Sequence, residues 1–194
     1  SPPPLVFPGP REKIEEKRIA VFVAEKSEAF GAVAIPCPLR MSDPGFAAFD
    51  VMNHILGGGD VWTSRLGVTI RVRNGLVYDT YSGVSTTLGN GYFFAQFGSN
   101  PENVDKAMAL LKSEIVKIHD HGVTAEEVAN AVSFKLGSWP RFTETSEQKA
   151  EELLDAAWFG LGLDYVARRP GIFRAVTKEM VDAAARKYLD PGAL

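Results

Sequence analysis

Apolar residues near the start of the chain fall in two short runs whose composition favours β-strands. The runs cover 18–25 (RIAVFVAE) and 30–38 (FGAVAIPCP), and the polar residues between them predict a hairpin. Pro36 and Pro38 place the second run at a sheet edge or at the end of its strand, because proline has no N–H to donate to a neighbouring strand.

The apolar pattern of 64–73 fits either a strand or a helix. Four positions alternate as they would in a strand: Leu66, Val68, Ile70 and Val72. A short helix is supported by Ser64 as an N-cap, by the Leu66/Ile70 pair and by Gly75 beyond its end. We therefore predict a helix in this segment.

Helical spacing of apolar residues marks five other segments. The first helix follows Asp43-Pro44-Gly45 and is expected to end at Gly57–Gly59, since glycine tolerates the left-handed conformation that terminates helices. A capping box of Thr124 and Glu127 opens another. The helices predicted after the first are 100–121, 124–136, about 144–160 and about 177–189.

A second hairpin is predicted from 76–87 and 91–99, which flank the turn Leu88-Gly89-Asn90. Strands and helices then follow one another as two strands, two helices, two strands and a run of helices. This order predicts an α+β fold, a two-layer domain in which an antiparallel or mixed sheet is covered by helices on one face.

Composition and charge narrow the class of protein. The chain has 194 residues, of which 45% are hydrophobic and 23% charged, enough for one large globular domain. A net charge of −3, with lysine and arginine scattered among acids, argues against a nucleic-acid partner. No apolar run approaches the roughly 18 residues of a membrane span. The proline-rich start, 1–17, is predicted to be a linker, and 18–194 a single module.

Three familiar kinds of catalytic or nucleotide site are disfavoured. Gly57–Gly59 lack the Gly-Lys-Ser/Thr ending of a phosphate loop, so a helix end with a flexible turn is the better interpretation. The chain contains neither His-x-x-Glu-His nor His-Glu-x-x-His, and His119 and His121 would point to opposite sides of a helix. Cys37, the only cysteine, lies in an apolar strand, where a thiol is unreactive.

Arg71 and Tyr78 remain as candidate functional residues. A guanidinium and a phenol that reach the same end of a sheet could hold a peptide carbonyl or stabilise an oxyanion. From the residues alone, a surface arginine beside a half-buried strand tyrosine is the more frequent explanation.

Three motifs together resemble the non-catalytic, C-terminal-type module of the pitrilysin or insulinase family of zinc metallopeptidases, which includes mitochondrial processing peptidase. They are MNHILGGG (52–59), Ser64-Arg65-Leu66 and Arg-x-x-x-Gly-Leu-x-Tyr (71–78), and the resemblance extends over nearly all of the chain after the linker. The stretch DVW (60–62) is slightly longer than is usual in that family.

The resemblance implies a zinc-free half paired face to face with a homologous module that carries the zinc. In such a pair the two modules enclose a chamber for extended peptides, and zinc in the partner activates water. By resemblance, Arg71 and Tyr78 contact the substrate and stabilise the tetrahedral intermediate at the partner's zinc, and Gly57, Gly58 and Gly59 contact substrate. No cofactor is expected in this chain itself.

The sequence therefore supports two hypotheses. In the first, this chain is the substrate-binding half of a zinc metalloendopeptidase and is inactive alone. The alternative is a non-enzymatic assembly or peptide-binding subunit of the same fold, which the presence of both Arg71 and Tyr78 disfavours. Family habit favours a periplasmic location, with the cytoplasm as the alternative.

Overall fold

The computed structural model describes residues 17–89 and 91–194. All of the predicted linker except Lys17, together with Asn90 of the predicted second turn, lies outside these residues. The described strands and α-helices are β1 (Ala29–Cys37), α1 (Phe46–Asn53), β2 (Val77–Ser85), β3 (Gly91–Ser99), α2 (Val104–His121), α3 (Ala125–Ser138), α4 (Ser146–Trp158), α5 (Tyr165–Arg174) and α6 (Lys178–Tyr188). Two π-helical segments, η1 (His54–Gly58) and η2 (Gly67–Val72), and three short 3₁₀ segments complete the described elements.

The three strands form an antiparallel sheet in the order β1-β3-β2. β1 pairs with β3 from Ala29 opposite Ser99 to Cys37 opposite Gly91 without a register shift. β1 is an edge strand and contains Pro36, as the sequence predicts. The expected second hairpin is also confirmed, because β2 and β3 are antiparallel neighbours.

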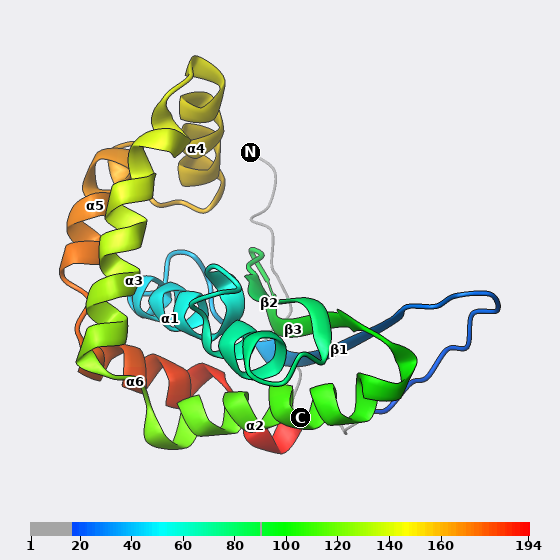
Figure 1. Cartoon of the computed structure of the whole chain (residues 1–194). Helices are drawn as coiled ribbons and strands as arrows, with labels where there is room; N and C mark the ends of the chain where they lie inside the picture. Colours follow the sequence, from blue (N-terminus) through cyan, green and yellow to red (C-terminus); the bar gives the residue numbers. More distant parts are fainter. Residues whose placement is uncertain (1–16, 90) are drawn as a thin grey trace.

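The predicted first strand, 18–25, is not formed. Residues 17–28 contain no strand, and this segment projects beyond the sheet as a long loop (Figure 1). Its apolar side chains face solvent, with Phe22 92% and Val21 79% exposed. A sequence that favours strands still needs a neighbouring strand and a face to cover, and no described segment supplies either at the free edge of β1.

The described helices cover one face of the sheet, which gives the predicted α+β architecture (Figure 1). Phe93 and Phe97 of β3 point into this layer and are fully buried. Phe49 of α1 meets the ring of Phe93 edge-on at 6.2 Å and that of Tyr188 in α6 at 5.7 Å. No helix within residues 17–89 or 91–194 lies over the opposite face, and the aromatic side chains on it are at least partly exposed: Phe30, Tyr81, Tyr92 and Phe94.

A helical arm stands beside this layer and consists of α3, α4, α5 and the 3₁₀ segment Trp139–Thr143 (Figure 1). α3 begins with the predicted capping box, in which the side chains of Thr124 and Glu127 each bond to the other's backbone N–H. The predictions for α2, α4 and α6 are confirmed. No local signal predicts α5, which contains Pro170 and Gly171.

Candidate functional site

The glycine turn consists of Gly57, Gly58 and Gly59 and lies at the end of the helix that starts as α1. The predicted left-handed termination is wrong: the helix continues as η1, and Gly59 has an extended backbone with φ −89°. Glycine is required here for close packing. A Cβ on Gly57 would lie 2.6 Å from Leu66 Cδ1 and 2.8 Å from Ser82 Oγ in β2. The turn is therefore pressed against the sheet, with Gly57 buried and Gly58 and Gly59 partly exposed.

Arg71 is carried by η2, so the helix prediction for 64–73 is confirmed. Its guanidinium carbon lies 4.6 Å from the ring centre of Trp62, in the DVW stretch that follows the glycine turn. Stacking on an aromatic face orients a guanidinium while leaving its N–H groups available at the edge of the plane. Within the described parts of the chain, no carboxylate or carbonyl accepts a hydrogen bond from Arg71.

Tyr78 lies in an irregularity of the sheet. The register between β2 and β3 shifts between Val77 and Asp79, so Tyr78 is the extra residue of a bulge and its ring is 51% exposed. Its hydroxyl donates to Asn100 Oδ1 at 2.5 Å, just before α2. Gly75, with φ +62°, turns the chain between η2 and β2, and its N–H bonds to the Arg71 carbonyl. Arg71 and Tyr78 thus flank one tight turn but engage different partners.

Arg65, the centre of the Ser-Arg-Leu motif, has a structural role that local sequence patterns do not reveal. Its Nε and Nη2 donate to the two carboxylate oxygens of Glu127 at 2.7 and 2.8 Å, and Nη2 also donates to the Gly122 carbonyl. Burial alone would raise the pKa of Glu127, but hydrogen bonds from Arg65 and from the Thr124 N–H outweigh it and hold that pKa below its usual value. The motif thereby ties the start of η2 to the corner between α2 and α3.

The histidines do not assemble a metal site. His54 stacks on Phe134 at 4.8 Å, and His119 Nδ1 lies 2.7 Å from Asp120. Across the described ranges, no cluster of three or more His, Cys, Asp or Glu side chains has a geometry that could hold a metal ion. Zinc therefore does not fit this part of the chain. Cys37 is fully buried, and burial raises the pKa of its thiol to about 11, which disfavours the nucleophilic thiolate.

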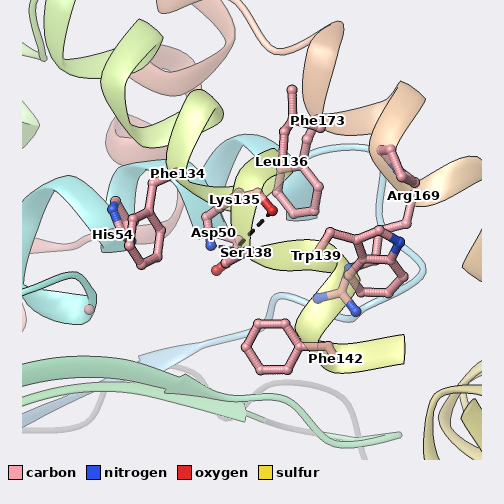
Figure 2. Close-up of a pocket in the computed structure, with 12 residues that line it drawn as sticks. Asp50, His54, Phe134, Lys135, Leu136, Ser138, Trp139, Phe142, Arg169 and Phe173 are labelled. Carbon is pink, nitrogen blue, oxygen red and sulfur yellow. Dashed lines mark hydrogen bonds and ion pairs between the residues drawn. The ribbon is translucent and has the colours of Figure 1, made fainter. Parts of the chain in front are cut away.

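A pocket of about 250 Å³ opens between α1, η1 and the helical arm (Figure 2). We call it the aromatic pocket, and its lining residues are Asp50, His54, Gly58, Phe134, Lys135, Leu136, Ser138, Trp139, Phe142, Arg169, Pro170 and Phe173. Gly58 belongs to both the pocket and the glycine turn, so the two features are continuous. Sequence patterns do not predict this pocket, because its walls come from three segments far apart in the chain.

The geometry defines a class of protein: an α+β module without a metal-ligand set of its own among the described residues, in which an oriented arginine and an exposed tyrosine flank the tight turn at Gly75. The family model for the peptidase M16 inactive domain matches residues 1–134. The chain belongs to this family, and the family expected from its motifs is confirmed. It is a non-catalytic domain of the zinc-peptidase type.

Relatives and solved structures agree with this assignment. A peptidase M16 inactive domain from Pseudomonas fluorescens is 25% identical, with a TM-score of 0.80 over 87% of this chain and 39% of that chain. The Helicobacter pylori non-peptidase homolog YmxG is 28% identical over 79% of this chain and 35% of its own length. An uncharacterized zinc protease of Streptomyces coelicolor is 30% identical over 62% of this chain and 28% of its own. The chain thus spans about a third of the length of these two curated relatives.

None of the helices described for residues 17–89 and 91–194 is both long enough and apolar enough to cross a membrane.

Proposed function

We propose that this chain is the zinc-free, substrate-binding half of a zinc metallopeptidase and that it presents Arg71 and Tyr78 to the active site of a homologous zinc-bearing module. The observation that carries the proposal is the state of Arg71. Its guanidinium is oriented by Trp62 at 4.6 Å, yet its N–H donors have no acceptor among the described residues. A cation fixed in place with free donors suits a developing oxyanion, because little reorganisation is needed when the charge appears.

Tyr78 complements this arrangement. The bulge turns its side chain outward, and the bond to Asn100 limits the orientations of the ring. In the assembled enzyme the hydroxyl exchanges Asn100 for an oxygen of the peptide, either the scissile carbonyl or a neighbouring one. Both donors then act on a peptide whose bond is cut by water that the partner's zinc activates.

The glycine turn lets a peptide approach the backbone closely. Gly58 and Gly59 are partly exposed and carry no side chain, so an extended peptide can lie against them. Two exposed apolar surfaces could contact the zinc-bearing module: the aromatic face of the sheet and the apolar run 19–23. Solved relatives that are inactive peptidase domains, such as the one from Pseudomonas fluorescens, support this division of labour.

Steady-state kinetics of the assembled peptidase test the proposal. Arg71→Ala should lower kcat roughly 100- to 1,000-fold, the usual effect of removing one oxyanion donor. Tyr78→Phe should lower it roughly 10- to 100-fold, because the ring remains and only the donor is lost. Arg73→Ala removes an exposed cation two residues from Arg71 and should leave kcat within about twofold. Wild-type turnover in both the Arg71 and Tyr78 variants would refute the assignment.

The alternative is a non-enzymatic assembly or peptide-binding subunit, and the similarity to YmxG of Helicobacter pylori, a non-peptidase homolog, favours it. Under that alternative the assembled protein cleaves no peptide, and Arg71→Ala affects neither assembly nor peptide affinity.

A further inference from the structure

The aromatic pocket has no role in the proposed catalysis, yet it is built like a ligand site. Two of its wall residues, Phe134 and Phe142, are 56% and 55% exposed, which is unusual for phenylalanine. Figure 2 shows Phe134 and His54 on one side of the opening, and Trp139 with Arg169 on the opposite side. Burial of exposed aromatic surface is favourable, so an apolar group placed between these walls would be bound.

We propose that the aromatic pocket binds one large apolar side chain, phenylalanine or leucine, of an extended peptide that passes the glycine turn. The proposal rests on the proposed function and names the substrate class for that site. Gly58 lines both the pocket and the turn, so one peptide can contact both features. The volume is adequate, since an apolar cavity of about 150 Å³ accommodates benzene and this pocket measures about 250 Å³.

Charge in the walls argues for a neutral occupant. Lys135 Nζ lies 2.8 Å from Asp50 Oδ2, and Arg169 Nη1 lies 2.8 Å from Glu152 Oε2. Both cations are thus already paired, and a carboxylate of a ligand would have to displace an acid of the protein to reach them. His54 adds a further aromatic wall, and burial first and the charge of Lys135 second lower the pKa of its imidazole, which favours the neutral form.

Arg169 also explains why a peptide side chain is a better occupant than a free hydrocarbon. Its guanidinium stacks over Trp139 at 4.5 Å. Its buried Nε has no acceptor anywhere in the described chain. A backbone carbonyl that accompanies the bound side chain can supply that acceptor after a small shift of the guanidinium, and a hydrocarbon cannot.

Binding of short peptides to the isolated chain, followed by NMR, tests the pocket directly. The probes are N-acetylated, C-terminally amidated pentapeptides of alanine with phenylalanine, leucine or alanine at the centre. The phenylalanine and leucine peptides should shift the indole resonance of Trp139 and bind roughly tenfold more tightly than the all-alanine peptide. The indole of Trp158, which is 63% exposed on α4 and does not line the pocket, serves as the internal control.

Two variants locate the effect. Phe142→Ala removes an exposed wall at little structural cost and should weaken the phenylalanine peptide at least about fivefold. Ser138→Phe places a ring at the pocket from its own wall and should weaken it similarly, whereas Trp158→Ala should change affinity less than about twofold. Equal affinity for all three peptides, an unmoved Trp139 resonance, or normal binding by both pocket variants would each overturn the proposal.

The outcomes separate this inference from the proposed function. A loss of kcat in Arg71→Ala together with no preference for the phenylalanine peptide would refute the binding role of the aromatic pocket and leave the catalytic proposal intact. A clear preference for the phenylalanine peptide that Phe142→Ala abolishes, together with normal turnover in Arg71→Ala, would support the pocket and refute the catalytic role of Arg71.

Discussion

The pair between Arg65 and Glu127 should be one of the strongest polar contributions to the stability of this fold. Glu127 accepts hydrogen bonds from Arg65 Nε at 2.7 Å, from Arg65 Nη2 at 2.8 Å and from the Thr124 N–H at 2.7 Å. Glu127→Ala removes all three of these hydrogen bonds and half of the capping box of α3. It leaves Arg65, whose side chain is only 22% exposed, with the Gly122 carbonyl as its remaining partner.

The expected loss follows from these contacts. A hydrogen bond to a charged group contributes about 1.5–3 kcal/mol, but water reaches a pair whose side chains are 22% and 28% exposed, so the lower end applies. Loss of the cap adds about 0.5–1 kcal/mol. We expect Glu127→Ala to lower the free energy of unfolding by about 2–3 kcal/mol, and the melting temperature by roughly 4–12 °C. Glu127→Gln should lose about half as much.

Urea unfolding followed by circular dichroism measures this difference, and Glu126→Ala is the matched control. Glu126 lies in the same first turn of α3 but is exposed, so its replacement should change stability by less than about 0.5 kcal/mol. The slope with urea concentration should stay constant, since the variant exposes no additional surface in the unfolded state. If the two alanine variants unfold at the same urea concentration, the pair does not tie η2 to the α2–α3 corner.

Two further predictions concern the glycine turn and His54. Gly57→Ala should destabilise the chain by about 1–3 kcal/mol in urea unfolding, because its Cβ would lie 2.6 Å from Leu66 Cδ1. The control is Gly137→Ala, at a helical site with no neighbour within 4 Å, which should stabilise the chain by about 0.5–1 kcal/mol. Stability changes of the same sign in both variants would disprove the packing argument. The pKa of His54 is lower in the folded chain than in the unfolded chain. The contribution of neutral His54 to the free energy of unfolding is therefore fully present above the unfolded pKa of about 6.5 and is lost as pH falls through the folded pKa. Between about pH 7.5 and pH 5, the midpoint of urea unfolding should therefore fall less in His54→Gln than in wild type. Equal falls in the two proteins would contradict a lowered pKa of His54.

Local signals in the sequence predict most of the helices and one of the hairpins. Thr124 with Glu127, and Thr177 before α6, mark helix starts that depend on residues three positions apart, so neighbours in sequence suffice. The run 18–25 fails because a strand exists only beside another strand. α5 is not predicted because Pro170 and Gly171 lower the helix propensity of this segment. In the folded chain, burial of Phe173 and the Asp164–Arg168 ion pair stabilise the helix.

Some features of the candidate site can likewise be predicted from local sequence, and others depend on the fold. Arg71 and Tyr78 can be selected from their motif, but the stacking on Trp62 and the bond to Asn100 depend on how the chain turns at Gly75. The motif also draws attention to the glycines, whereas their physical reason, contact with the sheet rather than a left-handed backbone, appears only in three dimensions.

Reconstitution from separate parts tests the division of labour between this chain and a zinc-bearing module. This chain and the zinc-bearing module of its parent peptidase are purified separately, and cleavage of an internally quenched fluorescent peptide is measured for each alone and for their mixture. We expect no cleavage and no bound zinc for this chain alone. We expect activity in the mixture to rise with added chain until the zinc-bearing module is saturated. Cleavage by this chain alone, or a zinc-bearing module whose full activity does not depend on it, would contradict the account.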